Sequence, residues 1–196
     1  MNAKFFEEQR REMVAAIRAI AEHIAAELGK TALDERVLRA MAKVPRHEFV
    51  PVEVQSYAYL NRPIPIGFDK TISQPMMVAV MTDLLELKPD DVVLEIGTGL
   101  GYQAAVLAEL ASRVYSVEII DELAQWARQR LNSVSNLLAR SLEAADGPQT
   151  NCQGEDPLPA PTKDATRWTY SRKPIPGISD RRRSARCVIF TTKETN

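Results

Sequence analysis

The chain has 196 residues, and its 25 Lys and Arg against 26 Asp and Glu give a formal net charge of −1. This length allows one domain with a sizeable core. The near-zero charge creates no global attraction toward nucleic acid or an anionic membrane, so we expect small molecules or proteins as partners. The sequence has no apolar run long enough for a signal peptide or a membrane span, which favours a cytoplasmic location.

The two cysteines, Cys152 and Cys187, form no CxxC pair and have no companion histidine cluster. This pattern suggests neither a disulfide framework nor a zinc site. We expect two free thiols and no metal.

The composition of the chain changes near Leu131. Leu, Ile, Val and Phe make up about 30% of residues 1–131 but about 15% of residues 132–196, below the roughly 20% that a packed core needs. Residues 132–196 also hold half of the prolines and a basic run, Arg181 to Arg183, which we interpret as solvated surface. The sequence therefore predicts an ordered part, 1–131, and an atypical, largely irregular tail, 132–196.

Helical spacing dominates the first part of the chain. Apolar residues three and four apart predict a helix from Phe5 to Leu28 that ends at Gly29. Asp34 is a suitable N-cap for a second helix, which Pro45 closes, and the following segment, 46–51, is interpreted as loop. In the first of these helices, the expected buried face consists of Val14, Ile17, Ile20, Ala21, Ile24 and Leu28.

A strand–helix alternation follows. Helices are predicted over 74–87 and 102–111, with a buried strand over 91–96 between them and a second, alternating strand over 113–118. This order predicts an α/β fold whose parallel strands are joined by right-handed crossovers.

The turn after the first of these strands is rich in glycine. Gly97, Gly99 and Gly101 lie between the strand and the next helix, where the backbone must turn tightly and approach a ligand closely. Glu118 ends the next strand, 21 residues after Gly97, and its carboxylate is placed to accept both hydroxyls of a ribose. Glycine turns are often purely structural, but this ordered combination favours a nucleoside site.

The glycine spacing is GxGxG and an acidic residue, Glu95, precedes it, whereas dinucleotide folds usually show GxGxxG. This pattern resembles the first motif of class I S-adenosylmethionine-dependent methyltransferases, which have a Rossmann-like fold. The resemblance implies S-adenosyl-L-methionine as cofactor. It also implies that Glu95, Gly97, Thr98, Gly99, Gly101 and Glu118 bind it.

Three upstream segments narrow the resemblance. Val44–Pro51, Asn61–Gly67 and Thr71–Pro75 resemble the signature segments of protein-L-isoaspartate O-methyltransferases, and the likeness runs from about Asp34 to Leu131. It implies methyl transfer to the carboxylate of L-isoaspartyl and D-aspartyl residues in damaged proteins, as a repair reaction. Proteins or peptides with such residues are the implied partners of an enzyme that we expect to be a monomer.

The chemistry suits these segments. A carboxylate is ionised at neutral pH and a sulfonium is already activated, so the reaction needs positioning rather than a general base. The resemblance assigns the catalytic contact to Ser73 and substrate contacts to Thr71 and Gln74. The competing interpretation of Ser73 is a simple N-cap of the following helix.

The resemblance ends after Leu131. The acidic turn and the apolar strand that the family would place next are not recognisable, since Asp146-Gly147 has no strand before it. We therefore expect an incomplete sheet with an unpaired edge. A shifted reading frame that replaced the C-terminal half is one hypothesis for such a tail.

Two alternatives to the enzyme remain. One is a catalytically inactive remnant or interaction protein that keeps the nucleoside-binding turn. The other is an NAD-dependent oxidoreductase, which the GxGxG spacing and the segment Thr71–Pro75 disfavour.

Overall fold

The computed structural model describes residues 3–24, 30–138, 170–171 and 185–189. In chain order its elements are α1 (Ala3–Ile24), α2 (Glu35–Lys43), the 3-10 helices η1 (Arg46–Phe49) and η2 (Val52–Tyr57), β1 (Ile64–Gly67), β2 (Lys70–Ile72), α3 (Pro75–Leu84), β3 (Val92–Ile96), α4 (Tyr102–Ala108), β4 (Arg113–Val117), α5 (Asp121–Leu138), β5 (Tyr170–Ser171) and β6 (Ala185–Ile189). Among these residues, no helix is both long and apolar enough to cross a bilayer.

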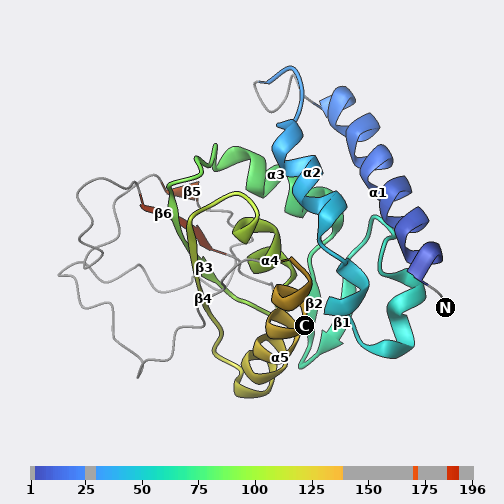
Figure 1. Cartoon of the computed structure of the whole chain (residues 1–196), viewed down its shortest axis with the longest axis vertical. Coiled ribbons are helices and arrows are strands. Elements are labelled where there is room, and N and C mark those ends of the chain that lie inside the picture. The colour runs from blue at the N-terminus through green and yellow to red at the C-terminus, as the bar shows by residue number, and fades with distance from the viewer. Residues whose placement is uncertain (1–2, 25–29, 139–169, 172–184, 190–196) are drawn as a thin grey trace.

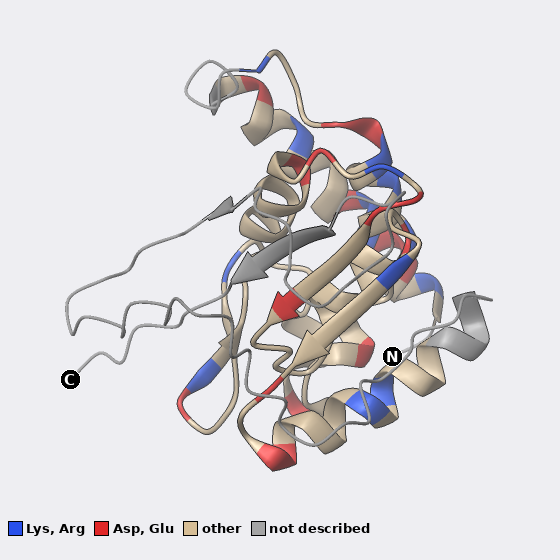
Figure 2. Cartoon of the chain, turned by 90° about the vertical axis from the view of Figure 1, so that its left-hand side faces the viewer, with Lys and Arg blue, Asp and Glu red and all other residues tan. Residues whose placement is uncertain are grey.

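The main sheet of the described part has the strand order β4-β3-β6-β5 (Figure 1), and Figure 2 shows its parallel strands β3 and β4 side by side. β3 pairs in parallel with both β4 and β6, and β5 pairs antiparallel with β6. From β3 the chain crosses through α4 to β4 on one side, while β6 occupies the other side. The carboxyl end of β3 is therefore a switch point of the sheet, the place where open α/β folds bind ligands.

The predicted α/β alternation is confirmed. The strands expected over 91–96 and 113–118 are β3 and β4, and the helices that bracket them are α3 and α4. Asp34 caps α2 as expected, since its Oδ1 accepts a 2.8 Å hydrogen bond from the Arg36 amide. α3 and α4 each end three residues before the predicted end of the helix, where the following turn interrupts the helical hydrogen bonds.

The buried face of α1 differs from the predicted one. Met13, Ile17 and Ala21 are buried together with Phe6, whereas Ile20 is 38% exposed. The buried face of α1 runs through positions 6, 13, 17 and 21, and Ile20 lies on the solvent side of this face. The last predicted residues, 25–29, lie outside the described residues.

Two segments before α3 contain structure that the sequence did not predict. The expected loop 46–51 includes η1, and residues 64–72 form the antiparallel hairpin β1-β2. The hairpin strands have four and three residues, too few to show a clear period, and a proline interrupts β1. In the turn between the strands Gly67, Phe68 and Asp69 all have positive φ values, of 95°, 53° and 53°.

Of residues 132–196 the structure describes the end of α5, which continues to Leu138, and the strands β5 and β6. β6 pairs in parallel with β3. This strand has the sequence Ala-Arg-Cys-Val-Ile, at the place where the sequence showed the first strand-like segment of residues 132–196. Cys152, Asp146-Gly147 and the Arg181–Arg183 run lie outside the described residues, as does the side chain of Cys187.

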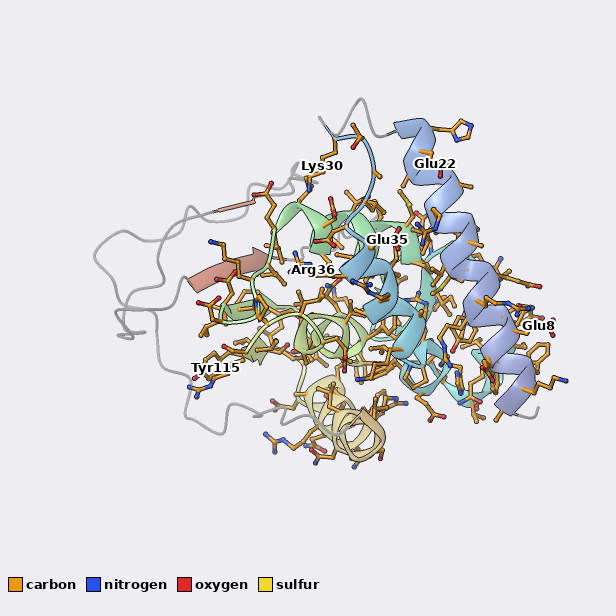
Figure 3. The ribbon with its side chains drawn as sticks, turned by 45° about the horizontal axis from the view of Figure 1, so that its top comes forward. Glu8, Glu22, Lys30, Glu35, Arg36 and Tyr115 are labelled. Carbon is orange, nitrogen blue, oxygen red and sulfur yellow. The ribbon has the colours of Figure 1, made fainter. Side chains whose placement is uncertain are left out.

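The three helices α1, α2 and α3 pack on one another, and α4 lies between α2 and β4 (Figure 1). A buried aspartate of α3, Asp83, connects this helix to the segment before α2. Asp83 forms a 2.7 Å ion pair with Lys30 and accepts a 2.6 Å hydrogen bond from the Asp34 amide. Figure 3 shows Lys30 and Arg36 at this junction, where Arg36 donates to the Leu87 carbonyl at 3.0 Å. These contacts join α2 and the segment before it to α3 and to the loop that follows α3.

Candidate active site

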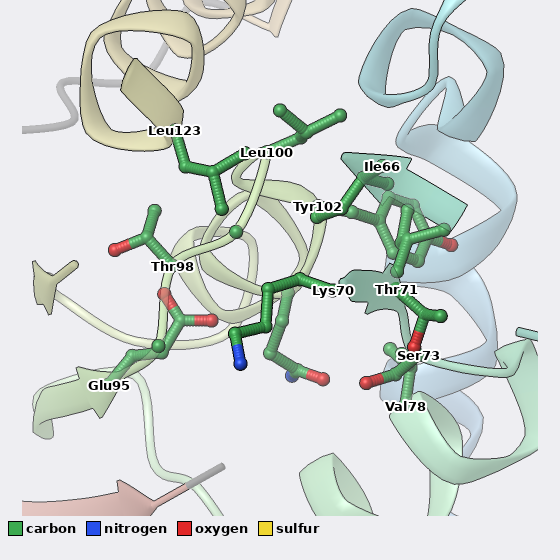
Figure 4. A pocket seen from close by; sticks show the side chains of 14 residues that line it. Ile66, Lys70, Thr71, Ser73, Val78, Glu95, Thr98, Leu100, Tyr102 and Leu123 are labelled. Atoms are coloured by element: carbon green, nitrogen blue, oxygen red, sulfur yellow. The ribbon is translucent and has the colours of Figure 1, made fainter. Parts of the chain in front are cut away.

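A cavity of about 100 Å³ opens at the carboxyl end of β3, between the hairpin and α4 (Figure 4). Its wall consists of Ile66, Lys70, Thr71, Ile72, Ser73, Val78, Glu95, Gly97, Thr98, Gly99, Leu100, Tyr102, Gln103 and Leu123. Pockets that enclose a drug-sized ligand measure roughly 300 to 1,000 Å³, so this cavity surrounds only part of such a ligand.

The glycine turn forms the floor of this cavity, and its backbone amides bond to the protein. Gly97 donates to the Val117 carbonyl at 2.7 Å, Thr98 donates to the same oxygen at 3.3 Å, and Gly101 donates to the Thr98 carbonyl at 2.9 Å. The turn is thus fixed by the end of β4 and offers few free amides to an anion. This suits a ligand without a pyrophosphate better than a dinucleotide.

Two of the glycines are required by their surroundings. Gly101 has a φ of 95°, and a Cβ there would lie 3.0 to 3.2 Å from the side chain of Leu131. Gly99 has a φ of 57°, and its Cβ would lie 3.3 Å from Ile66 in the hairpin. The turn therefore touches both α5 and the hairpin, and a side chain at either position would push these elements away.

Glu95 is the most unusual group of the site. It is fully buried, and one carboxyl oxygen accepts a hydrogen bond from Ser116, which in turn bonds to Thr98 at 2.6 Å. The other oxygen, Oε1, has no hydrogen-bond partner among the described residues. Burial raises the pKa of Glu95 to about 8. The negative charge of Glu118 also raises this pKa, whereas the hydrogen bond from the Ser116 hydroxyl lowers it. A protonated carboxyl that faces a cavity can both donate and accept.

Glu118 lies beside the cavity and is not part of its wall. Its Oε2 accepts a 2.8 Å hydrogen bond from the Gly99 amide, and its Oε1 accepts from the amides of Ile119 and Ile120 at 2.9 and 3.1 Å. The carboxylate is thus aimed at the glycine turn, and each oxygen keeps acceptor capacity for a hydroxyl.

Ser73 lies across the cavity from Glu95 (Figure 4). It does not cap α3, because the N-cap residue is Gln74 and no side chain of that residue bonds to the helix. The Ser73 hydroxyl has no hydrogen-bond partner among the described residues, whereas its carbonyl accepts a 2.7 Å bond from Arg46. The backbone of Ser73 is therefore fixed and its hydroxyl is available.

Arg46 lies behind Ser73 and is fully buried. It also donates to the Ala58 carbonyl at 2.7 Å and lies 4.7 Å above the ring of Tyr102. Burial lowers the pKa of Arg46 to about 10 and raises that of Tyr102 to about 12, so the first is charged and the second neutral at pH 7. Sequence reasoning placed Arg46 in a signature segment but gave it no role.

The two predicted substrate contacts differ in position. Thr71 lines the cavity, whereas Gln74 does not, because its amide donates to the Asn61 carbonyl at 3.0 Å. Asn61 in turn caps α3 through a 3.0 Å bond from the Met76 amide. Asn61 thus holds the segment 71–75 from outside the cavity.

Of the predicted site residues, the structure brings six together in the cavity wall: Thr71, Ser73, Glu95, Gly97, Thr98 and Gly99. The other three, Gln74, Gly101 and Glu118, support this wall from behind or beside it. Their individual roles stay predictions.

Three functional candidates were missed by sequence reasoning. Ser116 is the direct neighbour of Glu95 in the register of β3 and β4. Gln103 donates to Thr82 at 2.8 Å and leaves its buried Oε1 without a partner among the described residues, and Lys70 extends into the cavity from β2. Assigning the register of the two predicted parallel strands would have placed Ser116 beside Glu95. No local sequence pattern marks Gln103 or Lys70 as part of a site.

The model of the protein-L-isoaspartate(D-aspartate) O-methyltransferase family matches residues 20–154. Protein-L-isoaspartate O-methyltransferase 1 of Polaromonas sp. is 65% identical over 122 residues, which cover 62% of this chain and 52% of that protein. Protein-L-isoaspartate O-methyltransferase 2 of Syntrophobacter fumaroxidans is 57% identical over 122 residues, 62% of this chain and 49% of that protein.

A solved structure of a protein-L-isoaspartate O-methyltransferase superposes with a TM-score of 0.54 at 24% identity, over 70% of this chain and 42% of the other. This likeness supports the fold predicted from the sequence, a class I methyltransferase fold with an incomplete sheet. The chain spans about half the length of the two curated relatives above. The family match covers more than half of the chain and includes the whole cavity wall, so the chain belongs to the protein-L-isoaspartate(D-aspartate) O-methyltransferase family.

Proposed function

We propose that the cavity at the end of β3 binds S-adenosyl-L-methionine and that the chain methylates the free carboxylate of isoaspartyl residues in proteins and peptides. One observation carries this proposal. The unpaired, buried carboxyl oxygen of Glu95 and the unpartnered hydroxyl of Ser73 belong to opposite walls of one cavity, at the switch point of an α/β sheet.

The residues of the site fit the cofactor. Unsatisfied buried polar atoms are rare in folded proteins, and here three residues of the cavity wall, Glu95, Gln103 and Tyr102, each have one. Oε1 of Glu95 and Oε1 of Gln103 would be satisfied by a ligand with amino and hydroxyl groups. Glu118, whose Oε2 accepts a hydrogen bond from the Gly99 amide of the glycine turn, would bind the ribose hydroxyls through its remaining acceptor capacity.

The bound cofactor supplies a methyl group that is already activated by the sulfonium charge. The chain itself therefore has to bind, orient and dehydrate rather than to transfer protons. Ser73 would orient the acceptor carboxylate through its hydroxyl, with Thr71 beside it in the wall. Ile66, Val78, Leu100 and Leu123 give this wall an apolar surface that keeps water from the reacting groups.

Transfer of a radiolabelled methyl group from S-adenosylmethionine to a synthetic isoaspartyl peptide tests this proposal. The matching aspartyl peptide serves as the substrate control. We expect labelling of the isoaspartyl peptide alone, with kcat/KM reduced at least about tenfold in Ser73→Ala, because one oriented hydrogen bond is lost.

Ser133→Ala is the matched protein control, since the Ser133 hydroxyl bonds only to the Gln129 carbonyl of its own helix, at 3.0 Å. We expect this variant to keep wild-type activity. Equal labelling of both peptides, or full activity in Ser73→Ala, would contradict the proposal. Cofactor binding without any methyl transfer would instead support the non-catalytic remnant, an alternative that the short span of the chain relative to its relatives keeps relevant.

A further inference from the structure

The hairpin β1-β2 places an ammonium group inside the cavity. Lys70 is the first residue of β2, and its side chain is on the same face as that of Ile72, two residues later. Ile72 is buried and pairs directly with Ile64 across the hairpin. Lys70 is therefore on the inner face of the hairpin, where an apolar side chain would be the ordinary choice.

The position of Lys70 is fixed by the turn that precedes it. Three consecutive residues with positive φ lead into β2, and the register shifts between Pro65 and Gly67, so that Gly67 pairs with Lys70. Such a turn is costly for Phe68 and Asp69, because their side chains disfavour this backbone conformation. The turn thus sets the register in which Lys70 begins β2 opposite Gly67.

No hydrogen bond or ion pair of Lys70 occurs with the residues that the structure describes. By contrast, Lys30 pairs with Asp83 at 2.7 Å, and the fully buried Arg46 donates to two carbonyls. Figure 4 shows the Lys70 amine pointing into the space between Glu95 and Ser73. Since the carboxyl of Glu95 is largely protonated at neutral pH, it does not balance this charge.

A positive charge without a partner in a partly enclosed cavity selects for an anion. Lys70 is three residues from Ser73 in the same wall, on the side of the acceptor rather than among the glycines. We propose that Lys70 binds the substrate carboxylate by a charge-assisted hydrogen bond and makes the site specific for an ionised acceptor. This inference rests on the proposed function and adds the residue that recognises the charge of the substrate.

Calorimetric titration of two peptides into the full chain with S-adenosylhomocysteine present tests the inference. One peptide carries the isoaspartyl residue and the other carries the same residue with its free carboxylate converted to an amide. We expect the wild-type chain to prefer the carboxylate peptide by at least about tenfold and Lys70→Met to lose this preference, because a charge-assisted bond has this magnitude. Lys70→Arg should keep most of it.

Lys88→Met is the matched control, because Lys88 is an exposed lysine outside the cavity wall. It should bind both peptides like the wild-type chain. The affinity for S-adenosylhomocysteine should be unchanged in all of these variants. A preference that survives in Lys70→Met would overturn the inference, as would a loss of S-adenosylhomocysteine affinity in that variant with the peptide preference intact, since the ammonium would then serve the carboxylate of the cofactor.

The titration measures binding without methyl transfer, so its result can contradict the role of Lys70 without contradicting the proposed activity, and the reverse. A wild-type chain that prefers the carboxylate peptide but transfers no methyl group would contradict the proposed activity and leave Lys70 as the anion contact. A wild-type chain that methylates the peptide, with the same KM in Lys70→Met, would contradict the role of Lys70 alone.

Discussion

At the scale of single residues, the site is built from polar groups in apolar surroundings. Glu95, Gln103, Arg46 and Tyr102 are all buried, and each retains one polar atom without a hydrogen-bond partner among the described residues. Such groups cost stability unless a ligand satisfies them. Their concentration in and behind one cavity is the physical signature of a binding site.

The raised pKa of Glu95 predicts a dependence of stability on pH. Glu95 is protonated in the fold below about pH 8, whereas its ordinary pKa is 4.5. Its stabilising effect is therefore complete below pH 4.5 and is lost as the pH rises toward 8. We expect the free energy of unfolding of wild type to fall relative to that of Glu95→Gln between about pH 5 and pH 8 in urea titrations.

Glu53→Gln is the control for this measurement, because Glu53 is exposed. Its stability should follow the wild-type pH curve. Parallel curves for wild type and Glu95→Gln would contradict a raised pKa at that position.

Arg46 predicts a separate effect on stability and positioning. Arg46→Met leaves the carbonyls of Ala58 and Ser73 without their buried donor, at a cost of about 1 to 3 kcal/mol each. We expect urea denaturation to show a loss of at least about 2 kcal/mol. Arg46→Lys should recover part of it, since an ammonium reaches one carbonyl more easily than both.

Arg11→Met removes an exposed arginine, 79% accessible, whose 3.7 Å ion pair with Glu8 lies on the surface of α1. It should change stability by less than about 1 kcal/mol. If Arg46→Met were equally mild, the buried hydrogen bonds of Arg46 would not be what fixes Ser73.

At the scale of elements, the glycine turn is the contact point of the sheet, α5 and the hairpin. Gly101 and Gly67 share a φ of 95°, but only Gly101 faces a crowded neighbour. Gly67→Ala should cost about 1 to 2 kcal/mol for the backbone conformation alone. Gly101→Ala should cost more, because the added methyl group also displaces Leu131.

Chemical denaturation of both variants and of Gly101→Ala with Leu131→Ala measures this difference. We expect the second substitution to recover part of the loss from the first, since it removes the crowded side chain. Equal losses at the two glycines would show that the packing against α5 is unimportant.

The same elements show how much could be predicted from the sequence. β3, the glycine turn, α4 and β4 were predictable, because a buried strand, three closely spaced glycines and an alternating strand have distinct local patterns. The hairpin was not, because its strands are short and its turn depends on residues that tolerate a positive φ. Lys70 was missed for this reason, since only the hairpin turns it into the cavity.

At the scale of the whole molecule, the ligand site lies between the main sheet and the hairpin segment that precedes α3. The sheet and the glycine turn form one side, and the segment that follows the N-terminal helices forms the other. The sequence predicted an incomplete sheet with an unpaired edge, and the described part of the sheet has four strands, in which β6 pairs with β3. A five-residue strand cannot reveal its partner from the sequence alone, because parallel pairing joins residues far apart in the chain.

Calorimetric titration of S-adenosylhomocysteine and of NADH into the full chain is the most direct test of the central claim, that the cavity at the end of β3 is an S-adenosylmethionine site. Glu95→Ala and the exposed control Glu53→Ala are titrated alongside. We predict saturable binding of S-adenosylhomocysteine, at least about tenfold weaker in Glu95→Ala and unchanged in Glu53→Ala, and no comparable binding of NADH. Tight binding of NADH, or binding of S-adenosylhomocysteine that does not respond to Glu95→Ala, would contradict the claim.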